Sequence, residues 1–191
     1  GRLRETGRRA AGAAFGHRLM TDRVVPGGTA VDLRDPTPIA AMVATVRAGF
    51  PRLVQLYDAT VSLQDRTVTT GRVAAELVQR WGAGGHVGRA SGRRFDSRRL
   101  PGYEPYDTLR FTVPVREEGD VDARVWIRIL EIGESLGMIE QILAGLPKGE
   151  HRVALPAVTA GAGGAGAEGA ALVEAFRGDF FAWVRLDGEG R

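Results

Sequence analysis

An apolar seam of helical period over residues 120–146 constrains the fold of this chain more than any other feature. Its members recur at alternating four- and three-residue steps, as in helices that pack in a bundle. They are Val125, Ile129, Ile132, Leu136, Ile139, Leu143 and Leu146. The seam predicts one long helix. Asp120 and Asp122 stand at its start, where carboxylates cap free amides and favour the positive end of the helix dipole.

Three further segments carry helical signals. Residues 2–20 are rich in Arg and Ala and predict a first helix. Asp35-Pro36 is a typical helix start, and an apolar stripe follows as far as Val61. Pro51 lies inside that stripe and should either kink or divide the helix, because its ring removes a donor and crowds the preceding turn. A shorter helix is predicted from Thr70 to Trp81, ended by Gly82.

The β signals are short. Val24-Val25-Pro26-Gly27-Gly28 predicts a chain reversal, and the alternating residues 109–115, with Pro114 and a Glu-Glu-Gly turn, predict a strand. Apolar runs on both sides of Arg177-Gly178-Asp179 predict a β-hairpin within residues 170–186. The fold class that we expect is α+β and mainly α, a helical bundle with an irregular loop over residues 84–107 and small antiparallel β elements.

The same patterns predict the domain organisation. Residues 1–156 form a helical core, residues 157–169 form a flexible linker of Ala and Gly, and residues 170–191 add the hairpin to the same domain. The sequence begins at Gly1 without Met and stops just after a strand-like run, so we treat it as a segment of a longer protein.

Composition excludes several classes of function. With 191 residues and 43% hydrophobic content the chain can bury a core, and it contains no run near the roughly 18 apolar residues that a membrane helix requires. We therefore expect no direct membrane insertion. The absence of Cys removes disulfides and thiolate metal sites. The net charge of +3 comes almost entirely from Arg, and few aromatic residues accompany the basic run 89–99, so no nucleic-acid binding is expected.

Isolated chemical motifs are weak. His17, His86 and His151 are scattered without the spacing of a metal site. The glycine-rich stretches 82–88 and 161–166 lack the strand and helix that a phosphate-binding loop requires, so we expect both to be turns.

Polar residues of the 84–124 region are the better candidates for a site. Arg89 and Ser91, on a turn that Gly88 and Gly92 make permissive, could present a charge and a hydroxyl group to a cavity or to a partner subunit. An arginine fork pairs well with carboxylates, and we favour a structural role in fixing the loop over direct proton handling. The arginines that could pair are Arg89, Arg98 and Arg124, and the acids are Asp96, Asp107 and Asp120. The full set of cavity- or partner-facing candidates is Arg89, Ser91, Gly92, Asp96, Tyr106, Asp107, Asp120 and Arg124; no catalytic residue and no metal ligand are expected.

The order of motifs in this region is specific. The motifs are Gly88-Arg89-Ala90-Ser91-Gly92, Phe95-Asp96-Ser97-Arg98-Arg99, Tyr103 to Asp107, Val113-Pro114, Gly119-Asp120 to Arg124, and Arg128, Glu131 and Ser135 on the long helix. This order resembles the large-subunit family that energy-converting nickel-iron hydrogenases share with the 49 kDa subunit of respiratory complex I. Gly27-Gly28 and the segment from Glu174 to Val184 also resemble family segments.

The resemblance implies a middle segment of a redox large subunit. In the family, metal-binding cysteine pairs lie before and after this region, so the isolated chain should be inactive. The parent would hold a nickel-iron centre, or a quinone in the same cavity if it is similar to complex I, next to the iron-sulfur cluster of a partner. Its partners would be an iron-sulfur small subunit and membrane-embedded proton-translocating subunits, with this part on the cytoplasmic face.

The branch within the family is indicated by a few residues. His86 and Val87 depart from the usual complex I pattern, whereas Phe176-Arg177-Gly178-Asp179 and Trp183 look closer to the hydrogenases. We therefore favour the energy-converting or formate hydrogenlyase type. A docking scaffold without chemistry of its own stays open as an alternative.

Overall fold

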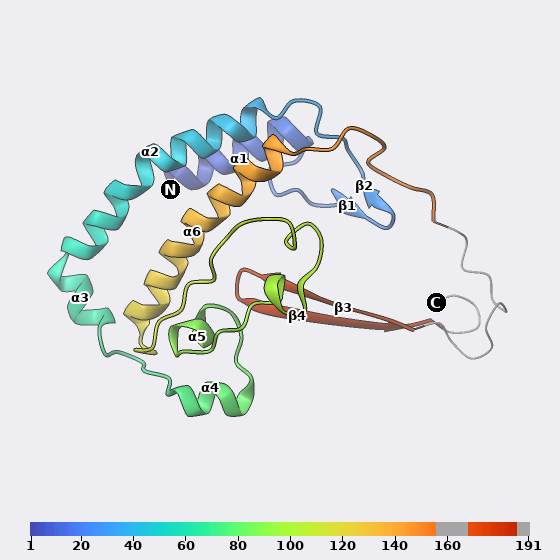
Figure 1. Ribbon diagram of the computed structural model, residues 1–191. Coiled ribbons are helices and arrows are strands. Elements are labelled where there is room, and N and C mark those ends of the chain that lie inside the picture. Colours follow the sequence, from blue (N-terminus) through green and yellow to red (C-terminus); the bar gives the residue numbers. More distant parts are fainter. Residues whose placement is uncertain (156–167, 187–191) are drawn as a thin grey trace. The chain divides into compact units, whose positions relative to one another are not determined.

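The computed structural model describes residues 1–155 and 168–186. Its helices are α1 (Arg2–Phe15), α2 (Thr37–Ala59), α3 (Val61–Thr67), α4 (Ala75–Trp81), α5 (Gly85–Ala90), η1 (Arg98–Gly102) and α6 (Val121–Ala144), and its strands are β1 (Val24–Val25), β2 (Gly28–Thr29), β3 (Glu168–Ala175) and β4 (Gly178–Arg185) (Figure 1). This confirms the predicted α+β, mainly α class. None of the helices in the described part of the chain has the length and apolar character needed to cross a membrane.

The chain divides into two compact units. The first contains residues 1–61 and 132–155, and the second contains residues 62–131 together with 156–191, of which 168–186 are described. Helix α6 contributes its second half to the first unit and its first half to the second. The predicted domain limits stay a prediction, and the linker predicted over 157–169 lies outside the described residues as far as position 167.

In the first unit α1 packs along α2 (Figure 1). Ala10 and Ala11 of α1 and Val43 of α2 are buried there. Helix α1 is shorter than predicted: it ends at Phe15 because Gly16 adopts a left-handed conformation, and its N–H group donates to the carbonyl of Gly12.

Helix α2 starts at Thr37, one residue later than predicted, because Pro36 takes the cap position; the Asp35 carboxylate still accepts the N–H of Thr37 at 2.9 Å. Pro51 does not divide it, since α2 is continuous as far as Ala59 and the break before α3 falls at the extended residue Thr60. One missing helical hydrogen bond is therefore tolerated here. The predicted apolar stripe is largely unburied, with Leu53 50% and Val61 72% exposed.

The chain reversal predicted at residues 24–28 is confirmed. Strands β1 and β2 pair antiparallel there, and Gly28 also forms a bridge with Arg152. Gly27 and Gly28 both have positive φ, and an added Cβ at either would overlap the backbone of residues 151–153. Both glycines are thus required by close backbone packing.

The second unit corrects three predictions. Helix α4 begins at Ala75 rather than Thr70, because Thr69 and Gly71 have positive φ; its end at Gly82 is confirmed. Part of the region predicted as irregular is helical, since α5 includes the arginine of the Arg-Ala-Ser-Gly motif. The segment 109–115 forms no strand, because no neighbouring segment pairs with it among the described residues.

The prediction of a long helix from Asp120 is confirmed by α6. Its most buried face differs from the predicted seam. Leu136 of the predicted seam is buried in the first unit, but so is Met138 outside the seam. In the second unit the buried residues are Ala123 and Ile127, neither of which belongs to the seam, whereas the seam residue Ile132 is 37% exposed. The helix therefore follows the predicted period but turns a shifted face inward.

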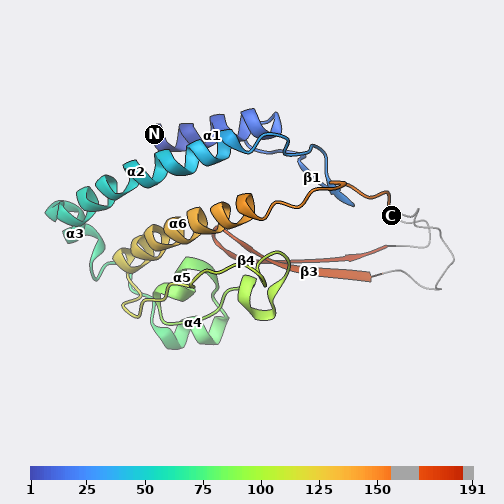
Figure 2. The same cartoon turned by 45° about the horizontal axis from the view of Figure 1, so that its top comes forward.

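The predicted hairpin is also confirmed. Strands β3 and β4 pair antiparallel, with Glu174 opposite Asp179 at the end next to the turn. That end lies against α5, as both views of the ribbon show (Figures 1 and 2). An added Cβ at Gly178 would be 2.9 Å from the backbone nitrogen of Gly85, so the approach depends on glycine at these positions.

Candidate functional site: a buried arginine–carboxylate network

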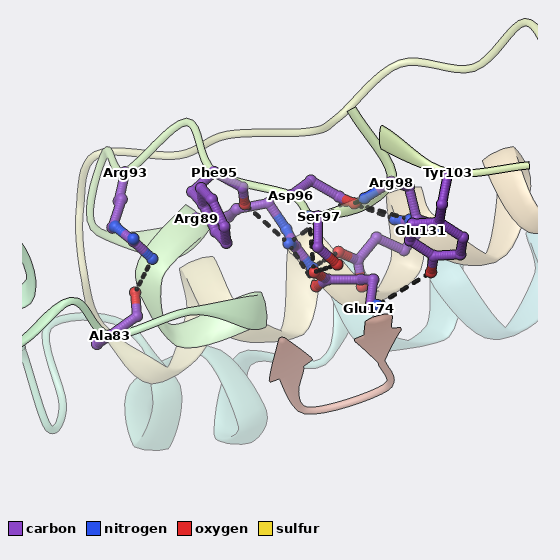
Figure 3. A network of polar contacts seen from close by, with 10 residues as sticks. All are labelled: Ala83, Arg89, Arg93, Phe95, Asp96, Ser97, Arg98, Tyr103, Glu131 and Glu174. Atoms are coloured by element: carbon purple, nitrogen blue, oxygen red, sulfur yellow. Dashed lines mark hydrogen bonds and ion pairs between the residues drawn. The ribbon is translucent and has the colours of Figure 1, made fainter. Parts of the chain in front are cut away.

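Arg89 lies at the centre of a buried network of charged groups in the second unit (Figure 3). Its side chain is 3% exposed. Its guanidinium forms ion pairs with three carboxylates: Asp96 at 3.5 Å, Glu174 at 2.9 Å, and Glu131. It also donates to the carbonyl oxygen of Phe95 at 3.2 Å. One side chain thus connects α5, the loop after it, α6 and β3.

Glycines allow α5 to hold Arg89 in this position. An added Cβ at Gly88 would overlap the carbonyl of Ala83, and one at Gly85 would overlap the backbone of Arg177 and Gly178. Helix α5 is therefore pressed directly against its neighbouring backbone. This close packing accounts for the burial of a charged residue on a helix of six residues.

Asp96 is fixed by two arginines. Arg98 donates from Nε to Oδ1 at 2.9 Å and from Nη2 to Oδ2 at 2.6 Å, and its backbone N–H donates to Oδ1 at 3.0 Å. Burial raises the pKa of Asp96, but the hydrogen bonds and charge of Arg98 and the charge of Arg89 outweigh burial and hold that pKa below its ordinary value. Asp96 is therefore a charged, fully engaged anchor at neutral pH.

Glu174 brings the hairpin into the network. Its side chain is 4% exposed, and its Oε1 accepts from Arg89. Its Oε2 accepts from the N–H of Ser97 at 3.1 Å and from the Ser97 hydroxyl at 3.2 Å. The backbone N–H of Glu174 donates to the hydroxyl oxygen of Tyr103 at 3.0 Å. Both carboxylate oxygens are thus occupied by donors (Figure 3).

Aromatic rings line one side of Arg98. Tyr106 lies edge-on to Tyr103, with ring centroids 5.0 Å apart, and edge-on to Phe111 at 6.1 Å. The guanidinium of Arg98 lies over the rings of Tyr106 and Phe111, at 5.8 Å and 5.1 Å. Burial, and then the neighbouring Tyr103, raise the pKa of Tyr106, with Arg98 opposing them. Tyr106 thus stays a neutral wall of the network.

A second group of predicted residues anchors backbone rather than forming charge pairs. Asp120 accepts the N–H of Thr69 at 2.7 Å and that of Ala123 at 2.8 Å, as an N-cap of α6. Arg124 donates to the carbonyls of Gly119 and Gly71, at 2.8 Å and 3.1 Å. These bonds hold the segment before α4 against the start of α6.

Ser91 and Gly92 extend this anchoring. The Ser91 hydroxyl donates to the carbonyl of Val73 at 2.9 Å. The N–H of Gly92, whose φ is 88°, donates to the carbonyl of Arg116 at 2.7 Å. The motif therefore ends in contacts with two distant backbone segments.

The structure brings together only some of the candidates. Arg89 and Arg98 pair with Asp96, whereas Arg124 binds backbone carbonyls. Asp107 is exposed, and its carboxylate accepts the N–H of Thr108 at 3.0 Å. It lies outside the network.

Sequence reasoning missed two acids of the network, Glu131 and Glu174. Glu131 belongs to the Arg-x-x-Glu motif on α6 and could have been found from it. The signal for Glu174 was weaker: the residue lies near the end of a strand, just before the Arg177-Gly178 turn.

Chemically, the network is a buried set of mutually satisfied charges. It holds three carboxylates and two guanidiniums, with side-chain exposure of 21% or less. Removing one partner of such a set leaves an uncompensated buried charge, so each member constrains the positions of the others. In residues 1–155 and 168–186 no group of three or more His, Asp or Glu side chains is placed to hold a metal ion.

His86 precedes Arg89 on α5, and its Nδ1 atom is buried. Burial lowers the pKa of His86, and so do the charges of Arg128, Arg89, Arg124 and Arg177. The imidazole is therefore neutral near pH 7, and it lies near these four arginines.

Several known proteins are similar in sequence to this chain. The family model described as "Respiratory-chain NADH dehydrogenase, 49 Kd subunit" matches residues 2–177. A subunit of the NADH-quinone oxidoreductase of Koribacter versatilis is 35% identical over 150 residues, which are 76% of this chain and 37% of that protein. Carbon monoxide-induced hydrogenase of Rhodospirillum rubrum is 31% identical over 186 residues, which are 94% of this chain and 49% of that protein. The chain thus spans less than half the length of these relatives.

Proposed function

Because this chain belongs to the family of the 49 kDa subunit of respiratory-chain NADH dehydrogenase, we propose that it is a segment of the large subunit of a membrane-associated, multisubunit redox complex. The complex transfers electrons coupled to dihydrogen and proton chemistry or to quinone chemistry. Its other members are an iron-sulfur small subunit and membrane-embedded subunits, and this segment lies on the cytoplasmic face. The names of the relatives, an NADH-quinone oxidoreductase subunit and a hydrogenase, support this proposal.

One structural observation carries the role of this segment. The motifs of the family resemblance, which are far apart in the sequence, meet at one side chain: Arg89 binds Asp96, Glu131 and Glu174, the last 85 positions away. Further donors of the same unit bind these carboxylates: the Ser97 N–H binds Glu174, and the Arg98 guanidinium binds Asp96. The network therefore acts as a lock that keeps the loop after α5 rigid, as a site for redox chemistry needs from its supporting residues.

Within the family we favour the hydrogenase type. The alignment with the carbon monoxide-induced hydrogenase extends over 94% of this chain, whereas that with the Koribacter versatilis protein covers 76%. The second candidate is a quinone-reducing subunit, which the description of the matching family model favours.

The residues of this chain do not fit a nickel-iron centre. Such a centre uses thiolate ligands, and the chain contains no Cys. We therefore derive no step through a metal or a quinone. In the proposal, either group is held by other parts of the parent protein, and this segment supplies rigid support.

The test has two parts. The coding sequence on both sides of this segment is read for a Cys-x-x-Cys pair on each side. The intact complex is then purified and assayed for hydrogen-dependent reduction of a viologen dye and, separately, for reduction of a quinone analogue. Two cysteine pairs with hydrogen-dependent reduction are the expected result. Quinone reduction without the pairs would favour the second candidate, and neither activity in an intact complex would favour a docking scaffold.

A further inference from the structure

The hairpin turn presents an exposed aromatic ring close to two arginines. Phe176 is 71% exposed. The Cζ atom of Arg177, in the same turn, lies 5.1 Å from the centroid of the Phe176 ring, and that of Arg128, on α6, lies 5.8 Å from it. All three residues belong to the second unit. We call this set the Phe176 patch.

The two arginines of the Phe176 patch differ from those of the buried network. Among the described residues, no carboxylate lies within 4.0 Å of Arg128 or Arg177, whereas Arg89 and Arg98 pair with carboxylates. Both are exposed. Their charges are therefore not neutralised by an ion pair within the described part of the chain.

Nearby acids are occupied elsewhere. Glu131, one turn from Arg128 on α6, and Glu174, just before the turn, both bind Arg89. Asp179 lies against the backbone of Gly84, where its Oδ1 occupies the space that an added Cβ would need. A carboxylate that neutralises the Phe176 patch therefore has to come from another segment or molecule.

The Phe176 patch is also held in place. The backbone of Arg177 and Gly178 packs directly on Gly85, and Glu174 anchors the strand that leads into the turn. The neighbouring His86 stays uncharged beside Arg128 and Arg177, whose charges are among the causes of its lowered pKa. A rigid, positively charged surface with an apolar centre loses little conformational entropy on binding.

We propose that the Phe176 patch is a docking surface for an acidic segment of a partner subunit. This inference rests on the proposed function, because it assumes that the chain works inside a multisubunit complex. Arg and aromatic side chains are enriched at the centres of protein interfaces and among residues that dominate binding. The guanidinium fork fits a carboxylate in two-point contact, and the neighbouring ring adds apolar contact area. The two arginines contact a single ring, Phe176, whereas proteins that bind single strands stack successive bases on several rings, so a protein partner is favoured for this patch.

The experiment uses the intact parent protein with its partner subunits. Arg128→Glu, Arg177→Glu and Phe176→Ala are compared with the wild type by co-elution of the subunits at increasing salt. The matched control is Arg52→Glu, which makes the same charge change at an exposed position of α2. Each variant's thermal unfolding is recorded, and it should stay close to that of the wild type because neither arginine of the patch has an ion-pair partner in the described residues.

The expected result is a binding loss of about tenfold or more for each patch variant, with a smaller salt dependence for the charge reversals and wild-type binding for the control. Wild-type binding by all three patch variants, in a complex that assembles and turns over, would overturn the inference and leave the proposed function intact. A parent that binds no redox subunit would overturn both. Loss of binding to RNA or to phosphatidylglycerol vesicles, with subunit binding unchanged, would reassign the patch to that ligand.

Discussion

The substitution Glu174→Gln tests whether the buried network stabilises the second unit. Glu174 faces donors on both oxygens, Arg89 on one and Ser97 on the other. A glutamine must therefore turn its amide NH₂ group towards one of these donors, which leaves a buried donor unpaired and Arg89 with one carboxylate fewer.

The size of the effect follows from two opposing contributions. Breaking a buried ion pair from one side costs about 3–5 kcal/mol. The network holds three carboxylates and two guanidiniums, so removing one negative charge also relieves repulsion. We therefore expect the lower end, about 3 kcal/mol. With a urea slope of about 2 kcal/mol per M, the unfolding midpoint should fall by roughly 1.5 M.

The control is Glu140→Gln, the same substitution in the exposed pair between Arg47 and Glu140. The side chains of that pair are 45% and 48% exposed, against 3% and 4% for Arg89 and Glu174. Urea unfolding followed by circular dichroism should show a large shift for Glu174→Gln and little change for the control, because solvent screens exposed pairs. Equal shifts in the two variants would refute the argument that burial gives the network its strength.

Three further predictions concern single residues. Gly85→Ala should lower the free energy of unfolding by about 2 kcal/mol or more, and with it the thermal unfolding temperature, because the φ of Gly85 is 60° and an added Cβ would overlap the neighbouring turn. Gly133 in α6 has open space around it, so Gly133→Ala should instead raise the free energy of unfolding by about 1 kcal/mol. Asp120→Ala should cost about 1–2 kcal/mol in urea unfolding through loss of the α6 cap, and a change within error would contradict that role. The lowered pKa of His86 means that the unfolded state binds a proton first, so stability should fall as the pH drops below about 6.5, and His86→Gln should reduce that slope when urea midpoints are compared between pH 7.5 and pH 5.5.

Sequence reasoning succeeded where local pattern decides the structure. The helical period recurs along the whole of α6, and it predicted a long helix. The turn signal at Arg177-Gly178 joins two apolar runs that are adjacent in the sequence, and it predicted a hairpin. The pairing of Arg89 with Asp96 was also within reach, since only seven positions separate them.

Sequence reasoning failed where contacts between residues far apart in the sequence determine the structure. Helix α5 has only six residues, and its position depends on backbone packing between Gly85 and the distant hairpin turn. The residues of segment 109–115 alternate as in a strand, but the segment has no strand-pairing partner among the described residues. Glu174 is 85 positions from Arg89, and no spacing rule links the two.

The most direct test of the account is amide hydrogen exchange in the intact parent complex, comparing the wild type with Arg89→Met. If Arg89 is a structural lock, protection should fall together in α5, in the loop around Ser97 and in β3, the segments that its guanidinium or its carboxylate partners connect. Unchanged protection with lost redox turnover would contradict the lock and would assign Arg89 a direct part in proton handling.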